Sequence, residues 1–311
     1  MTHTADDALL GQFIPLHYHH NMLQDEARMQ GFRSALNHVV KPGAKVLELG
    51  GGIGVLSFFA AQKASKVWCV ERNPVLAATA RDTLMHNSNG YKVEVIVADA
   101  VHYLPPEPVD VVVCEMLHSA LLREKQVEVI DSFKRRYLAH FGGRLPVFVP
   151  EACIQGVQPV QQDFVYNGYC AATPVFQNPV TQHPRTTGLG EPALYQIFTY
   201  DAELALQCEW HGQILAVRAG TLNALRFVTK NVLAILPDTR STIDWHNAYL
   251  VMPLAHSQQV EAGDVIDIRF SYPVGAPLEA LQPDVVVIPS EVHLYPEGML
   301  QADMPPARML A

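Results

Sequence analysis

The stretch "VLELGGGIG" (residues 46–54) decides the fold, because it places a glycine-rich turn directly after an apolar, strand-like run. Gly50, Gly52 and Gly54 fall where the backbone must turn sharply and let a ligand approach without a Cβ in the way. Residues 54–64, which follow, have the apolar spacing of a helix. This order indicates a site for a nucleotide-type cofactor, although a glycine turn alone also occurs as a tight connection without a ligand.

Around that stretch, short apolar runs alternate with helix-length segments. Runs rich in Val, Ile and Leu lie at residues 45–49, 66–70, 92–98, 110–114 and 144–149. Residues 74–87, between two of them, have helical spacing. Continuous apolar strands separated by helices are typical of a parallel sheet covered on both faces. We therefore expect an α/β, doubly wound (Rossmann-like) domain over residues 45–149.

Different patterns flank this domain on each side. Within residues 1–44, the segment 21–39 has the pattern of one amphipathic helix, expected to lie over the cofactor site. After Pro150, short strand-like runs punctuated by Gly and Pro predict a β-rich, barrel-like domain over residues 150–311. Such runs lie at residues 194–200, 223–236, 247–253 and 264–272. Residues 169–192, rich in Pro, Thr and Gly, are expected to form an excursion loop.

Composition limits the partners. The 311 residues include 31 acids and 22 Lys or Arg, a formal charge of −9, so nucleic acid is disfavoured and a cationic substrate is favoured. Five scattered cysteines without a CxxC spacing indicate a reducing, cytoplasmic environment. No signal peptide or membrane-spanning run is recognisable, so we expect no membrane association. The histidines in "HYHH" (residues 17–20) lack partners at metal-ligand spacing, so no metal is expected.

Acids at the ends of the strands identify the kind of cofactor. Glu71 ends the second strand about 20 residues after the glycine turn, where an acid accepts hydrogen bonds from ribose hydroxyls. Asp99 follows the third strand at the same edge of the sheet. Glu48 disfavours a pyrophosphate but suits the amino group and sulfonium of S-adenosylmethionine. A methyl donor is therefore favoured over a dinucleotide, with hydride transfer as the alternative.

A second motif, "DVVVCEMLHSALLREKQ" (residues 110–126), carries two acids nine positions apart, Glu115 and Glu124. A guanidinium is flat, permanently charged and has five N–H donors, so planar carboxylates hold it best. Glu115 closes a buried strand, where an unpaired carboxylate is costly. Glu124 has a simpler alternative reading, as an acid favoured by the dipole in the first turn of a helix.

These segments together resemble the protein arginine N-methyltransferases. The resemblance is carried by "HHNMLQDEARMQGFRSAL" (19–36), "VLELGGGIGVLSFFAAQ" (46–62), "VER" (70–72) and "CEMLHSALLRE" (114–124). The resemblance is good over about residues 17–150 and weak in the β-rich half that follows. It implies an S-adenosylmethionine-dependent N-methyltransferase acting on a guanidino nitrogen of arginine.

The resemblance also implies roles for individual residues. Arg28 would reach the carboxylate of the donor, and His19 and Met22 would line the donor pocket. Glu48, Gly50 and Gly52 would cradle the amino-acid part of the donor, and Glu71 its ribose. Asp99 and Ala100 would lie beside the adenine, although the spacing there is one residue short. Glu115 and Glu124 would hold the guanidino group.

The β-rich half departs from the family. A Thr-His-Trp loop is replaced here by Ile243, Asp244 and Trp245. Trp245 is expected to wall the substrate pocket, or else to be a core residue of a strand. The acid corresponding to Asp25 loses its usual histidine partner, and His246 follows the tryptophan one position later.

This divergence leaves the acceptor open. We expect free arginine or a small arginine-like metabolite in preference to protein arginine. The alternatives are methylation of another amine or hydroxyl, or a non-catalytic protein that binds S-adenosylmethionine. A homodimer is expected, with residues 169–192 as a possible dimerisation arm.

Overall fold

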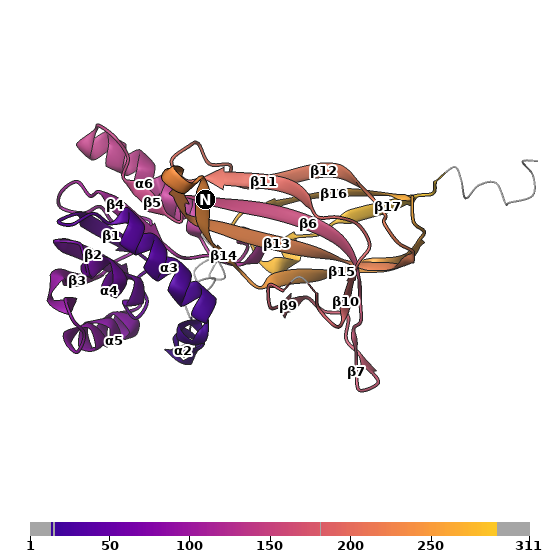
Figure 1. The fold of residues 1–311 in the computed structure, drawn as a ribbon, viewed down its shortest axis with the longest axis horizontal. Helices are drawn as coiled ribbons and strands as arrows, with labels where there is room; N and C mark the ends of the chain where they lie inside the picture. Colours follow the sequence, from indigo (N-terminus) through magenta and orange to yellow (C-terminus); the bar gives the residue numbers. More distant parts are fainter. Residues whose placement is uncertain (1–13, 15, 181, 291–311) are drawn as a thin grey trace, which may run out of the picture.

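In the computed structural model, which describes residues 14, 16–180 and 182–290, a parallel sheet with helices lies beside an elongated antiparallel barrel (Figure 1). The expected α/β domain followed by a barrel-like domain is confirmed. Residues 1–13 of the expected N-terminal segment and residues 291–311 at the end of the expected barrel domain lie outside the described residues.

The parallel sheet has the strand order β3-β2-β1-β4-β5. Its strands are β1 (Lys45–Leu49), β2 (Lys66–Glu71), β3 (Val93–Val97), β4 (Val111–Cys114) and β5 (Val147–Val149). All four neighbouring pairs are parallel, so the carboxyl ends of the strands meet at one edge. The five apolar runs of the sequence correspond to these five strands.

Helices cover both faces of this sheet. They are α4 (Val55–Ala61), α5 (Pro74–Met85) and α6 (Gln126–Phe141), with the 3₁₀ turns η1 (Gly90–Lys92) and η2 (Ser119–Leu121). The α4 and α5 side chains pack against Val67 and Cys69 on one face, whereas α6 packs against Leu47 and Val112 on the other. The sequence analysis did not identify α6.

The N-terminal segment forms two helices, so the expectation of a single helix over 21–39 is wrong. Helix α2 (Leu16–Gln24) ends before Asp25, and α3 (Glu26–Val39) begins after it. The Asp25 side chain accepts a hydrogen bond from the Arg28 backbone N–H at 2.9 Å and thereby caps α3. Phe32 of α3 is fully buried in a cluster that includes Val46 of the parallel sheet and Leu233 of the barrel. Helix α3 therefore packs against both the parallel sheet and the barrel.

Two antiparallel sheets form the barrel. The larger holds β6 (Ala152–Gln162), β9 (Val175–Gln177), β10 (Thr186–Gly188), β11 (Ala193–Thr199), β13 (Gly220–Leu236), β14 (Ser241–His246) and β15 (Tyr249–Val260). The smaller holds β12 (Gln207–Leu215), β16 (Val265–Pro273) and β17 (Asp284–Ile288). The turns η3 (Pro237–Thr239) and η4 (Leu278–Ala280) connect strands. The four predicted runs correspond to β11, β13, β15 and β16.

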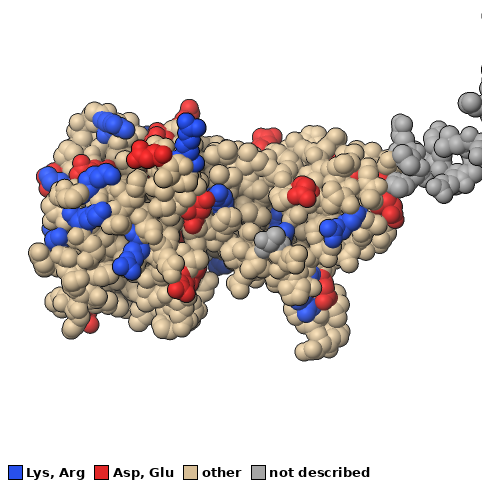
Figure 2. Space-filling view, viewed as in Figure 1, with Lys and Arg blue, Asp and Glu red and all other residues tan. Residues whose placement is uncertain are grey.

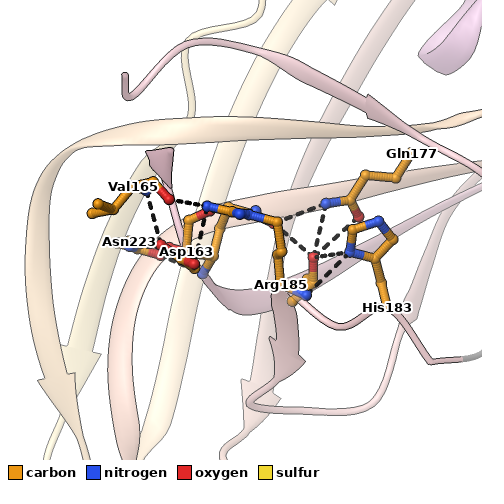
Figure 3. Close-up of polar contacts among 8 residues, drawn as sticks. Asp163, Val165, Gln177, His183, Arg185 and Asn223 are labelled. Atoms are coloured by element: carbon orange, nitrogen blue, oxygen red, sulfur yellow. Dashed lines mark hydrogen bonds and ion pairs between the residues drawn. The ribbon is translucent and has the colours of Figure 1, made fainter. Parts of the chain in front are cut away.

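Residues 169–192 are not a simple loop, which corrects the expectation from composition. The hairpin of β7 (Val165–Tyr166) and β8 (Tyr169–Cys170) projects from the barrel (Figures 1 and 2), and β9 and β10 join the larger sheet. Polar side chains hold the base of this excursion (Figure 3). The Gln177 amide donates to Gln162 Oε1 at 2.9 Å and to Thr186 Oγ1 at 2.8 Å, and Arg185 pairs with Asp163 at 3.0 Å.

The buried face of α6 gives a stability prediction. Phe133 is fully buried against Tyr137 and Phe148, so Phe133→Ala should lower the free energy of unfolding by about 3–5 kcal/mol. Leu138→Ala, on the exposed side of the same helix, should change it by less than about 0.5 kcal/mol. Equilibrium unfolding in urea measures both, and equal losses would contradict the assigned faces.

Candidate functional site

One cavity of about 970 Å³ lies at the carboxyl edge of the parallel sheet, between this sheet, the N-terminal helices and the barrel. The structure brings all twelve sequence-predicted site residues to its wall: His19, Met22, Arg28, Glu48, Gly50, Gly52, Glu71, Asp99, Ala100, Glu115, Glu124 and Trp245. They come from elements separated by more than 200 positions in the sequence. Their individual roles stay predictions.

The glycine turn has no room for larger residues. Gly50 and Gly52 have φ values of 78° and 54°, which glycine adopts without strain. A Cβ at Gly51 would lie 2.3 Å from Cys69 Sγ, and one at Gly52 would lie 2.8 Å from the His19 ring. Burial, and then the charge of Arg28, lower the pKa of His19, whose Nε2 is buried without a hydrogen-bond partner. A neutral imidazole therefore covers the turn.

Two acids flank the glycine turn, each in a different environment. Glu48 is 2% exposed and accepts a hydrogen bond from the Ser57 hydroxyl. Burial raises the pKa of Glu48 to about 7, despite that hydrogen bond. Glu71 instead accepts backbone N–H groups, from Gly52 at 2.8 Å and from Asn73 at 2.7 Å. The Glu71 carboxylate is thus held in one orientation at the end of β2.

Asp99 and Ala100 lie farther along the same edge. Asp99 accepts a hydrogen bond from the Val101 N–H at 3.0 Å, and its other oxygen lies 3.6 Å from Arg72 Nη1. Ala100 is buried. This end of the cavity is therefore partly apolar, with one half-buried carboxylate at its rim.

The Arg28 guanidinium pairs with Glu115 through Nη2 and Oε2, a contact that the sequence analysis did not anticipate. Burial opposes the Arg28 charge, but Glu115, Asp25 and Glu48 outweigh it and raise the pKa of Arg28. Its Nε and Nη1 are buried without a hydrogen-bond partner. Buried donors are nearly always paired, so these two N–H groups mark a position for an acceptor.

Glu124 precedes helix α6, whose N-cap is Lys125, so it does not lie in the first turn of the helix. Burial, and then the negative charge of Glu115, raise the pKa of Glu124 to about 8, while Arg123 and Arg28 act in the opposite direction. The charge of one glutamate therefore acts on the other. Two carboxyl groups that repel each other in this way favour binding of a cation between them.

Trp245 lies both in the cavity wall and against the apolar core. Its side chain is half-buried beside Phe32, with ring centroids 6.1 Å apart, and it also lines the cavity. The indole N–H donates to Asp25 Oδ2 at 3.3 Å. The hydrogen bond that Asp25 would otherwise receive from a histidine thus comes from Trp245. The next residue, His246, lies beside Tyr249 instead, with ring centroids 6.5 Å apart.

Sequence reasoning missed several residues of the cavity wall. Met116 lies over the glycine turn, since a Cβ at Gly50 would meet its Cγ at 2.9 Å. His118 contacts Phe176 edge to face at 5.2 Å, and burial lowers the pKa of His118 to about 4. Phe176 belongs to β9, and only the pairing of β9 with β15 brings it here. No local motif signals that pairing.

The described part of the chain contains neither a cluster of metal ligands nor a helix that could cross a membrane. Within residues 14, 16–180 and 182–290, no group of three His, Cys, Asp or Glu side chains is arranged to hold a metal ion. None of the helices in these residues combines the length and the apolar character needed to cross a membrane.

Comparison with known proteins agrees with this architecture. Residues 46–138 match the family model for the methyltransferase domain. The chain resembles protein arginine N-methyltransferases. It is 32% identical to protein arginine N-methyltransferase 1 of Caenorhabditis elegans over 151 residues, which is 46% of this chain and 43% of that enzyme. The resemblance expected from the sequence is thereby confirmed.

Two further proteins match nearly their full length. An uncharacterized protein of Methanothermobacter thermautotrophicus is 28% identical over 278 residues, covering 86% of this chain and 97% of that one. A chain of the Trypanosoma brucei PRMT1 enzyme–prozyme heterotetrameric complex with AdoHcy has a TM-score of 0.66 at 15% identity. That match covers 87% of this chain and 98% of the other, and it supports the two-part fold.

The raised pKa of Glu124 predicts a pH-dependent effect on stability. Between the ordinary value of 4.5 and about 8, the folded state holds a proton that the unfolded chain releases. The free energy of unfolding of the wild type should therefore fall, relative to that of Glu124→Gln, as the pH rises from 5 to 9. Thermal unfolding across this range measures the difference.

Proposed function

We propose that the protein is an S-adenosylmethionine-dependent N-methyltransferase that acts on a guanidino nitrogen. The observation that carries the proposal is that Glu115 and Glu124 line the same cavity as the glycine turn. Two interacting carboxyl groups form a binding site for a flat cation. A cofactor site and a cation site that share one cavity can bring two reactants together.

The residues of this chain fit S-adenosylmethionine. The Trypanosoma brucei relative is in a complex with AdoHcy, the demethylated form of this donor. Here the unpartnered Nε and Nη1 of Arg28 offer two N–H groups to the donor carboxylate, and Glu48 offers a carboxylate to its ammonium. Glu71, held at the end of β2 by the Gly52 and Asn73 N–H groups, suits the ribose hydroxyls, and Asp99 and Ala100, which line the same cavity, would lie beside the adenine. When bound, the donor supplies an electrophilic methyl group on a sulfonium.

The two glutamates would act by orientation and charge. Carboxylates on two sides of a guanidinium fix its plane and draw positive charge onto the nitrogens that they bind. The remaining nitrogen thereby recovers lone-pair character for attack on a methyl group. Binding of this cation requires deprotonated Glu124, so it should release the proton that Glu124 holds below pH 8.

A small acceptor, free arginine or an arginine-like metabolite, is favoured over protein arginine. The cavity of about 970 Å³ lies at the upper end of the range for one drug-sized ligand, and the donor alone occupies much of that space. Phe176 and His118, in edge-to-face contact, line the barrel side of the cavity. An extended peptide would need a longer open groove.

Methyl transfer can be tested directly. The protein, incubated with isotope-labelled S-adenosylmethionine and arginine, should yield a methylated guanidine detectable by mass spectrometry, and arginine-containing peptides should react more slowly. Glu115→Gln and Glu124→Gln should each lower kcat/KM by about 10²-fold or more, because each removes a charged contact with the guanidinium. Glu203→Gln, at an exposed residue that does not line the cavity, is the matched control.

Other outcomes of this experiment would favour the alternative functions. If only a different amine or a hydroxyl accepts the isotope-labelled methyl group, that group and not a guanidine is the acceptor. Donor binding without turnover of any acceptor would make the protein a non-catalytic binder. The pH profile gives a further check: kcat/KM should fall as the pH drops below about 8, since protonation of Glu124 removes its charge.

We also infer a homodimer, formed in the cytoplasm through the projecting β7–β8 hairpin. Val165, Tyr166 and Tyr169 are exposed on this hairpin, and its tip shows no charged side chain in Figure 2. The hydrogen bonds and ion pair of Figure 3 hold its base. A rigid, apolar projection is suited to docking on a second copy. The Trypanosoma brucei relative also assembles with other chains, as a heterotetramer.

The hairpin predicts the effect of one substitution on assembly. Tyr169 is 74% exposed, and Tyr169→Asp should shift the protein from dimer to monomer, because a desolvated charge opposes docking. Tyr91→Asp, at a residue 86% exposed on the other domain, should leave the dimer intact. Sedimentation velocity at micromolar concentration measures both variants. A monomeric wild type would refute the dimer.

A further inference from the structure

The loop that carries the two glutamates has an unusual backbone. Ala120, Leu121 and Arg123 have φ values of 58°, 53° and 64°, in the left-handed region that residues with a side chain rarely adopt. All three lie between Glu115 and Glu124. Such conformations persist only where the surrounding structure enforces them. The contacts that enforce this loop therefore determine how the two carboxyl groups are placed.

Side chains of the barrel bind both polar groups of Ala120. The Ala120 N–H donates to Thr229 Oγ1 at 2.7 Å, and the Tyr272 hydroxyl donates to the Ala120 carbonyl oxygen at 2.9 Å. Thr229 comes from β13 and Tyr272 from β16, in the two different sheets of the barrel. Ala120, Thr229 and Tyr272 are all fully buried. The loop is thus fixed from the interior of the barrel.

Two more buried side chains connect these contacts. The Thr229 hydroxyl donates to Gln155 Oε1 at 2.9 Å. The Tyr195 hydroxyl lies 3.3 Å from the same oxygen and 2.7 Å from the Tyr272 hydroxyl. Gln155, Tyr195, Thr229 and Tyr272 therefore form a connected set of buried polar contacts around Ala120, which we name the polar ring. The single Tyr195 hydroxyl proton serves one of its two contacts at a time. Since these groups are shielded from water, loss of one member leaves its neighbours without a partner.

Backbone contacts extend this attachment along the loop. The Gly275 N–H donates to the Leu121 carbonyl oxygen at 2.7 Å, and the Arg123 N–H donates to the Ala276 carbonyl oxygen at 2.7 Å. The Asn247 amide donates to the Leu117 carbonyl oxygen at 3.0 Å. These bonds fix both arms of the loop, whereas the polar ring fixes its left-handed centre.

We propose that the four residues of the polar ring are positioning residues that place Glu115 and Glu124 for the acceptor. None of the four lines the cavity, so they act through the loop and not by touching a ligand. This inference rests on the proposed function for the identity of the acceptor. It goes beyond the proposed function in assigning control of the acceptor side of the site to the interior of the barrel.

Thr229→Val provides the test, because it keeps the shape of the side chain and removes the hydroxyl. We expect kcat/KM for the guanidino acceptor to fall by about 10- to 100-fold through misplacement of the carboxyl groups. The Kd of S-adenosylhomocysteine should change much less than kcat/KM, since the ring reaches the donor side only through the pairing of Glu115 with Arg28. The lower limb of the pH profile should shift, because the distance between the glutamates sets the coupling of their charges.

Matched variants separate positioning from general destabilisation. Thr229→Ser retains the hydroxyl and should restore most of the activity, whereas Thr221→Val, near the start of β13 and eight residues before Thr229, should leave it unchanged. Tyr272→Phe removes the second hydroxyl that contacts Ala120. This variant replaces Thr229→Val in the test if Thr229→Val does not fold. An unchanged kcat/KM in both ring variants, or an equal loss of donor affinity, would overturn the proposal.

A readout that needs no acceptor distinguishes failure of this inference from failure of the proposed function. Amide hydrogen exchange over residues 116–124 should be slow in the wild type and in Thr229→Ser, and faster in Thr229→Val. If the wild type methylates no guanidine but exchange changes in this way, the proposed acceptor is wrong and the attachment of the loop stands. Unchanged exchange would overturn the polar ring whatever the acceptor.

Discussion

The structure depends on the concentration of negative charge around one buried guanidinium. Glu48 and Glu115 both act on Arg28, and Glu115 pairs with it directly. Without this cation, burial of so many carboxyl groups at the end of a parallel sheet would be costly. With it, one acid is neutralised, while Glu48 and Glu124 keep raised pKa values and are ready to receive further positive charge. The site therefore combines the ion pair of Arg28 with Glu115 and two further acids, Glu48 and Glu124, that could each bind a cation.

Much of this arrangement could be predicted from the sequence because it depends on local patterns. Apolar runs followed by Glu71, Asp99 and Glu115 place each acid at the end of a parallel strand, and parallel strands end at a common edge. The twelve predicted residues consequently share one cavity. The pairing of Arg28 with Glu115 was not predictable in this way, since it depends on the angle at which α3 crosses the sheet.

The parts that sequence reasoning missed depend on contacts between distant segments or on single side chains. Asp25 sits inside a continuous amphipathic pattern, so only its capping contact reveals that two helices meet there. Strand β6 was missed because glutamines alternate with apolar residues along it, and some of those glutamines are buried inside the barrel. Phe176 enters the cavity through strand pairing within a segment whose composition is that of a loop.

The separation of α2 from α3 has a consequence for entry into the site. Helix α2 carries His19 and Met22 over the cavity, yet His19 is its only buried residue, whereas α3 buries four. Detachment of α2 thus exposes little apolar surface and needs less free energy than detachment of α3. Opening of the cavity on this side would then involve only the nine-residue helix α2 and would leave the packing of the sheet beneath it unchanged.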